Sequence, residues 1–215
     1  MNHDIKMPVN SLQEKKTLTE KHIITESGEK NIQIPSNTDA HLFFFVYDAT
    51  VKLTIDLIGE WSNVACSIIV ISAARIVSGI DFSVTLKASH TKADVYALSL
   101  LGDNAKAQVN GGIVIDPWLI QVEGYLSEEN MLLWENITIK TLPMLDVRSN
   151  DVKASHGATI DRLDPQKLFY LSAKWLSASQ AQRLMVQSYM QKALDHANCI
   201  DENLIDDMFV KVGIV

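Results

Sequence analysis

The chain has 215 residues, of which 47% are hydrophobic, so it can bury a core of its own. Its 26 acidic residues outnumber the 19 basic ones and give a formal net charge of −7. This balance argues against nucleic-acid binding, which requires a clustered basic surface. No apolar run is long enough to span a bilayer, and the first residues lack the apolar core of a signal peptide.

Residues 1–21 are polar and charged, and we expect them to form a loose N-terminal arm. From His22 onward, apolar and polar residues alternate with a period of two, as in Val51, Leu53 and Ile55, which is typical of strands. Strand-like segments continue to about residue 160 and are separated only by short breaks. Because no helical segments lie between them, a doubly wound sheet is not expected.

A weak internal repeat points to the architecture of this β region. The segments NVACSII, KADVYAL and IQVEGYL begin at Asn63, Lys92 and Ile120, at a spacing of about 28 residues. Such a repeat favours a stacked β body over residues 22–160, in which each coil buries its inner face on its neighbours. A β-sandwich remains the alternative, because the repeat lacks a fixed asparagine or glycine ladder.

The pattern changes to a helical one near the C-terminus. Asp164 and Pro165 form an N-cap and N1 pair, Ser177 is placed to cap a second helix, and Asp201 a third. Apolar residues recur every three or four positions in the second of these segments. We therefore expect residues 161–215 to form a small helical domain attached to the β body.

The two cysteines lie far apart in segments of different kinds. Cys66 is in an apolar strand-like segment and is expected to be a buried core residue. Cys199 lies between two expected helices and belongs to no Cys-x-x-Cys motif, so a zinc site is not expected. Unpaired thiols are typical of a reducing compartment, and this favours a cytoplasmic protein.

Residues 143–190 carry a series of short motifs that follow one another in a fixed order. They include NDV at 150–152, SHGAT at 155–159 and LFYL at 168–171, followed by an amphipathic helix. This series resembles the C-terminal core of the SufB/SufD family of iron–sulfur cluster assembly scaffolds. The likeness covers roughly residues 83–190 and extends more weakly back to residue 42.

The resemblance implies a mainly β fold, with a right-handed parallel β-helix body followed by a C-terminal helical domain. It also implies that the protein is a scaffold and not an enzyme. Family members pair through their β-helix bodies, so the expected partner is a SufB-like subunit or a second copy of this chain. Their C-terminal helices dock the ABC-type ATPase SufC, and residues 177–198 are the segment expected to do so here. The cofactor that the resemblance implies is a transient iron–sulfur cluster at a subunit interface.

His156 is the candidate metal ligand. The resemblance places the matching histidine at the subunit interface and associates it with building the cluster, and imidazole is an acceptable iron ligand. The alternative is structural: SHGAT could be a corner that closes the β-helix, with Gly157 allowing the backbone to turn. The chain also departs from the family, because Ala154 stands where SufD relatives often carry cysteine and Gly157 where SufB relatives carry glutamate. It therefore resembles a shortened, SufD-like member.

Motifs of the common hydrolases and nucleotide-binding enzymes are missing, including Gly-x-Ser-x-Gly and the Walker-type loop. Glu128 and Glu129 are adjacent, so they should point to opposite faces of a strand, and both are expected at the solvated surface. His90 is expected to stabilise a turn. Two other functions stay open: a carbohydrate-active β-helix enzyme, and a family member that has lost cluster chemistry and only binds partners.

Overall fold

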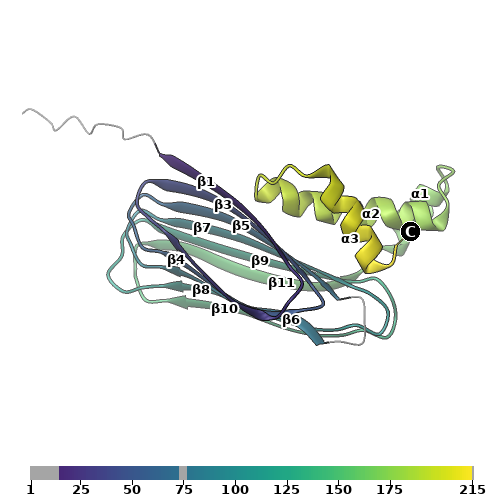
Figure 1. The fold of residues 1–215 in the computed structure, drawn as a ribbon, viewed down its shortest axis with the longest axis horizontal. Helices are drawn as coiled ribbons and strands as arrows, with labels where there is room; N and C mark the ends of the chain where they lie inside the picture. The colour runs from purple at the N-terminus through teal and green to yellow at the C-terminus, as the bar shows by residue number, and fades with distance from the viewer. Residues whose placement is uncertain (1–14, 73–76, 215) are drawn as a thin grey trace, which may run out of the picture.

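The computed structural model describes residues 15–72 and 77–214, in which eleven strands are followed by three helices (Figure 1). The strands are β1 (Lys16–Ile24), β2 (Gly28–Ile34), β3 (Thr38–Tyr47), β4 (Thr50–Leu57), β5 (Asn63–Ser72), β6 (Val77–Leu86), β7 (Lys92–Leu101), β8 (Lys106–Ile115), β9 (Val122–Leu132), β10 (Thr138–Val147) and β11 (Val152–Arg162). The helices are α1 (Pro165–Ser172), α2 (Ala178–His196) and α3 (Glu202–Val212).

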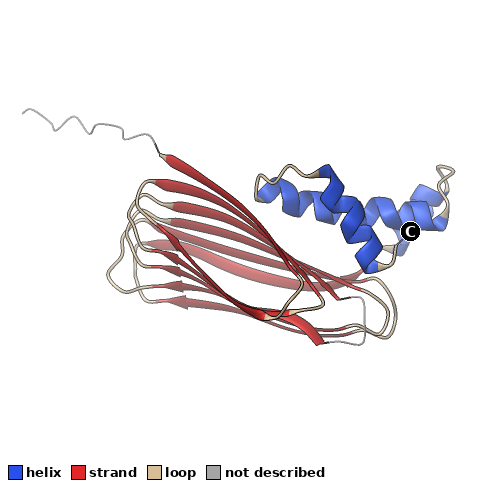
Figure 2. Cartoon of the chain, viewed as in Figure 1, coloured by secondary structure: helices blue, strands red, loops and turns tan. Residues whose placement is uncertain are grey.

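The strands form two parallel sheets between which the chain alternates. Sheet A contains the odd-numbered strands in the order β1-β3-β5-β7-β9-β11, and sheet B the even-numbered strands in the order β10-β8-β6-β4-β2. Every neighbouring pair is parallel, and successive coils stack in chain order (Figure 2). The protein is therefore a parallel β-helix followed by C-terminal helices, which confirms the expected fold. Because β-sandwich sheets are antiparallel, the alternative is wrong.

The strand register explains the weak repeat. Asn63 pairs with Lys92, so the first two repeat segments are in register as expected. Lys92 pairs with Glu123 and not with Ile120, which displaces the third segment by three residues. The coils differ in the length of their turns, and this difference blurs the period that can be read from the sequence.

The core of the β-helix consists of apolar side chains that stack from coil to coil. Leu42, Cys66, Val95 and Leu126 are paired in register on β3, β5, β7 and β9, and all are buried in one cluster. Burying an aliphatic side chain stabilises the fold by about 1.5–3 kcal/mol. Cys66 is a buried core residue, as expected, and burial raises the pKa of its thiol.

Helices α2 and α3 cover the outer face of sheet A toward the C-terminal ends of its strands (Figure 1). One cluster joins the two layers, and it includes Phe43, Phe45, Ile69, Leu98, Val186, Met190 and Phe209. Strands β3, β5 and β7 are thus buried on both faces there, which accounts for continuous apolar runs such as residues 68–71. On sheet B, β4 alternates between buried and more exposed positions, as a strand with one solvated face does.

The helix boundaries follow the expected capping residues. The side chain of Asp164 accepts a hydrogen bond from the backbone of Gln166, and Asp201 caps α3 in the same way. Ser177 and Gln180 form a reciprocal capping box at α2. Within the part of the chain that the structure describes, no helix combines the length and the apolar composition needed to cross a membrane.

The element boundaries differ from the expected ones by a few residues. Strand β1 begins at Lys16, so residues 16–21 of the expected arm belong to sheet A. Residues 1–14 lie outside the described residues. At the other end, β11 continues to Arg162, two residues past the expected limit of the β body.

Candidate functional site

His156 lies in the middle of β11, the last strand of sheet A. It pairs with Leu126, so it continues the column of inward-facing core residues by one further coil. Because α1 and not another strand of sheet B follows β11, the side chain is exposed. Within residues 15–72 and 77–214, His156 makes no hydrogen bond or ion pair, and its ring is available to a ligand.

SHGAT is therefore a strand segment and not a corner, so the structural alternative for His156 is wrong in its geometry. In the described ranges, the one glycine with a positive φ is Gly213, at the end of α3. A Cβ atom built on Gly157 would meet no other atom within 4 Å. Neither a turn nor close packing requires glycine at this position.

No thiol of the described chain lies close to His156. Cys66 belongs to the same inward column, but it is three strands away, or about 14 Å at the usual strand spacing. Cys199 lies in the α2–α3 connection, where partial burial raises the pKa of its thiol. The described residues contain no group of three or more histidine, cysteine or acidic side chains placed to hold a metal ion. His156 can supply a single ligand to a cluster held with other ligands.

The outer edge of β11 is unpaired, since within the described residues its one partner is β9. Nearly every residue of β11 is exposed. Exposed apolar side chains occur on the last strands of both sheets at this end, namely Ile160 on β11 and, on the outer face of sheet B, Leu142 and Met144 on β10. An unpaired strand with apolar neighbours is the kind of edge that pairs with another chain.

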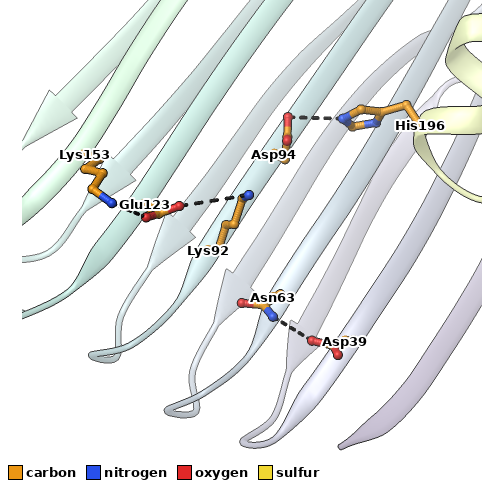
Figure 3. A network of polar contacts seen from close by, with 7 residues as sticks. All are labelled: Asp39, Asn63, Lys92, Asp94, Glu123, Lys153 and His196. Carbon is orange, nitrogen blue, oxygen red and sulfur yellow. Dashed lines mark hydrogen bonds and ion pairs between the residues drawn. The ribbon is translucent and has the colours of Figure 1, made fainter.

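A row of polar side chains crosses the outer face of sheet A near the N-terminal ends of its strands (Figure 3). The Asn63 amide donates a hydrogen bond of 2.7 Å to Asp39. Further along the row, Lys153 lies 2.9 Å from one Glu123 oxygen and Lys92 4.0 Å from the other. Both lysines keep the pKa of Glu123 below its usual range, with the Lys153 hydrogen bond as the main cause.

His196, in the last turn of α2, joins two strands of sheet A. Its Nδ1 lies 2.9 Å from the Ser67 hydroxyl, and its Nε2 lies 3.1 Å from the Asp94 carboxylate (Figure 3). The hydrogen bond from His196 lowers the pKa of Asp94. These three residue types form the triad of many hydrolases, but Ser67 is fully buried and out of reach of a substrate. The arrangement attaches α2 to the sheet.

Glu128 and Glu129 do point to opposite faces of β9, but neither is simply solvated. Glu128 lies in the interior and is 1% exposed, which corrects the expectation of a surface residue. One carboxylate oxygen accepts a hydrogen bond from Thr141, and the other has no partner in the part of the chain that the structure describes. Burial raises the pKa of Glu128. On the outer face, Glu129 accepts hydrogen bonds from Tyr96 and Lys192.

The corners that precede the strands of sheet A carry a second stacked column. Asn37, Trp61, His90 and Gln121 occupy these corners and all have positive φ. The rings of Trp61 and His90 are stacked, with 4.0 Å between centroids and 1° between planes. Nδ1 of His90 lies 3.0 Å from the side-chain oxygen of Gln121. This contact confirms the expected turn-stabilising role of His90.

Comparison with known families adds to this geometry. A model of the family described as "SUF system FeS cluster assembly, SufBD core domain" matches residues 37–189, which is more than half of the chain. The chain belongs to the SufBD family. SufD of Escherichia coli is 27% identical over 115 residues, covering 54% of this chain and 27% of that protein. A SufBD family protein of Synechocystis is 26% identical over 125 residues, covering 58% of this chain and 28% of that protein.

The SufBD match includes every strand from β3 onward and most of α2. His156 and the unpaired edge of β11 both lie inside the matched range. In SufD of Plasmodium falciparum the identity is 35% over 72 residues, which cover 33% of this chain and 5% of that protein. This chain thus spans about a quarter of the length of the first two SufBD relatives and a smaller part of the third.

Proposed function

We propose that this SufBD protein is a SufD-like scaffold subunit that takes part in assembling iron–sulfur clusters. The observation that carries the proposal is the position of His156, which is exposed and unpaired on an edge strand within the SufBD core. The protein pairs with a SufB-type subunit, or with a second copy of itself, through the end of the β-helix that carries β11. The iron–sulfur cluster is the cargo of this assembly, held for a time at the interface.

The edge of β11 supports pairing on physical grounds. Unpaired N–H and C=O groups along an exposed strand can form hydrogen bonds to a strand of another chain, and exposed apolar side chains on the last two strands, such as Ile160 and Met144, add area that a partner can bury. A partner that adds a strand here brings its own side chains next to His156. In this arrangement the thiolates that the chain lacks near His156 come from the partner.

The C-terminal helices support docking of a SufC-type ATPase, but through a different surface from the one expected. Met185 is buried in α2 and is not available, whereas Leu184 is about half exposed. Helix α1 buries none of its residues. Its Phe169 is exposed, and Trp175, just beyond its end, is 97% exposed. We therefore assign the docking surface to α1 and the connection that follows it.

Pairing is tested by light scattering on the purified chain, alone and mixed with the SufB-type subunit of the same organism. We expect a dimer with itself or a 1:1 complex with SufB. Replacing Met144 and Ile160 with aspartate should abolish the association, because both side chains are at least half exposed and lie on β10 and β11, the last strands of the two sheets. The matched control is Ile58→Asp, in the corner that follows β4 and away from β10 and β11, which should leave pairing intact. A chain that stays monomeric with and without SufB would contradict the proposal.

A second candidate is a family member that only binds partners. The absence of a cysteine near His156 in the described chain favours it, since Ala154 occupies the adjacent inward position on β11. Such a protein would pair and dock in the same way but would add nothing to iron uptake. Iron uptake by the complex therefore separates the two candidates.

A further inference from the structure

A groove lies along the corner of the β-helix that leads into sheet A. Two depressions of about 530 and 570 Å³ adjoin there, and Trp61 lines both of them. We define the corner groove by Trp61, Asn63, His90, Gln121, Glu123 and Lys153. Volumes of several hundred Å³ are typical of sites that hold small ligands.

The corner groove repeats its geometry from one coil to the next. Each coil supplies a corner side chain and, two residues later, an outward-facing side chain of sheet A: Trp61 with Asn63, then Gln121 with Glu123 two coils further on. Neighbouring strands are about 4.8 Å apart, so these pairs recur at that interval along the groove. A ligand that extends along the axis of the β-helix therefore meets one aromatic ring followed by polar groups at a regular interval.

Trp61 gives the groove a fixed aromatic surface. Its φ of 62° is uncommon for a bulky residue, and its ring is held flat against His90. The side chain is nevertheless 50% exposed, at the junction of the two depressions. A rigid indole of this kind offers an apolar surface against which the C–H face of a sugar ring can stack.

The charged groups of the groove neutralise one another. Glu123 lies between Lys153 and Lys92, so neither lysine is left as a strong site for an anion (Figure 3). The Asn63 amide nitrogen forms a hydrogen bond with Asp39, and the Gln121 side-chain oxygen forms one with His90. Among the described residues, the amide oxygen of Asn63 and the amide nitrogen of Gln121 have no hydrogen-bond partner, and they can serve as acceptor and donor. A free acceptor, a free donor and mutually neutralised charges suit a ligand with hydroxyl groups better than a charged ligand.

We propose that the corner groove binds a neutral oligosaccharide, with a sugar ring stacked on Trp61 and hydroxyls bonded to Asn63 and Gln121. The site is separate from His156 and does not depend on the scaffold role. The proposal concerns binding and not hydrolysis. A glycosidase acid needs a raised pKa, and the pKa of Glu123 in the groove is lowered instead.

The test is isothermal titration calorimetry of the full chain with three neutral probes, maltohexaose, cellohexaose and mannohexaose. We expect saturable binding of at least one probe at millimolar concentration. Trp61→Ala should weaken that binding by about tenfold, which corresponds to about 1.4 kcal/mol, and Trp61→Phe should restore part of it. Asn63→Ala, which leaves the corner stack in place, should also weaken it. The control Trp118→Ala removes a corner-loop tryptophan that is 93% exposed and outside the groove, so it should change nothing.

Three results would overturn the proposal. The first is the absence of saturable binding for all three probes. The second is binding that survives both Trp61→Ala and Asn63→Ala unchanged. The third is tighter binding of a charged probe, oligogalacturonate or a chitosan hexamer, than of any neutral one, since this would show that the charges of the groove are not neutralised.

Discussion

Glu128 shows how one side chain in the interior of a β-helix can change the pH dependence of the whole fold. Burial of the Glu128 carboxyl, with one of its oxygens unpartnered, disfavours the charged form and raises the pKa of this group. Gly111 faces it from β8: a Cβ atom on Gly111 would lie 2.0 Å from the Phe82 ring and 2.7 Å from the unpartnered oxygen of Glu128. Glycine at position 111 therefore leaves room for both side chains.

Glu128→Gln should stabilise the protein at neutral pH. Below about pH 4 the carboxyl is protonated in both the folded and the unfolded chain, and its contribution does not vary. As the pH rises, the unfolded chain ionises first, so stability is lost up to the raised pKa of the folded state. The variant lacks this loss, and its free energy of unfolding near pH 8 should exceed that of the wild type by about 1 kcal/mol or more.

Urea denaturation at several pH values measures this difference. Glu129→Gln is the matched control, because Glu129 lies on the outer face and pairs with Lys192, so its loss should destabilise the protein near pH 8. A Glu128→Gln variant whose stability follows that of the wild type at every pH would show that burial does not raise the pKa of Glu128.

At the residue scale, the sequence predicts those contacts of a side chain that involve residues nearby in the chain. The caps at Asp164 and Ser177 depend on residues two and three positions away, and both are confirmed. The burial of Glu128 depends on Gly111, which is brought opposite it only by the stacking of coils. The sequence also misses the contacts of His196, whose partners are 129 and 102 residues away.

At the scale of elements, the attachment of α2 combines an apolar face with a few polar contacts. His196→Ala should lower the free energy of unfolding by about 1–3 kcal/mol, because it leaves the buried Ser67 hydroxyl without a partner. Urea denaturation measures the change, and Gln191→Ala at an exposed position of the same helix is the control. Equal stability of the two variants would show that packing alone holds α2.

The exposed aromatic residues around α1 lead to a separate prediction. Replacing Phe169 and Trp175 with serine should greatly weaken binding of the SufC-type ATPase and leave the melting temperature unchanged, since neither side chain is buried. Surface plasmon resonance measures the binding. Val210→Ser, at an exposed apolar position on α3, is the control. If the double variant binds the ATPase as well as the wild type does, the docking surface lies elsewhere.

The element types themselves could largely be predicted from the sequence. Alternation with a period of two marks the sheet B strands, whose outer face is solvated, and capping residues mark all three helices. The sequence does not predict that β11 is an extended edge strand at the end of the β-helix. The glycine in SHGAT suggests a turn, but parallel pairing with β9 keeps the segment extended. The exposure of His156 follows from the order of the sheets and not from its neighbours in sequence.

At the scale of the whole molecule, sheet A ends in an edge strand at each end of the β-helix, and β11 is the edge strand at the C-terminal end. The same end carries His156 and several exposed apolar side chains, and the C-terminal helices lie over the neighbouring face of sheet A (Figure 1). In the account proposed here, one end of the body builds the cluster interface and the attached helices connect it to the ATPase. Iron should therefore bind to the assembled complex and not to this chain alone.

Iron uptake after anaerobic reconstitution tests this claim most directly. We predict that the isolated chain takes up little iron and that its complex with a cysteine-bearing SufB-type subunit takes up more. His156→Ala should lower uptake by the complex and leave pairing and melting temperature nearly unchanged. Ser155→Ala, at the adjacent exposed position on β11, should behave like the wild type. Equal uptake by the His156→Ala and wild-type complexes would contradict the account and favour a subunit that only binds partners.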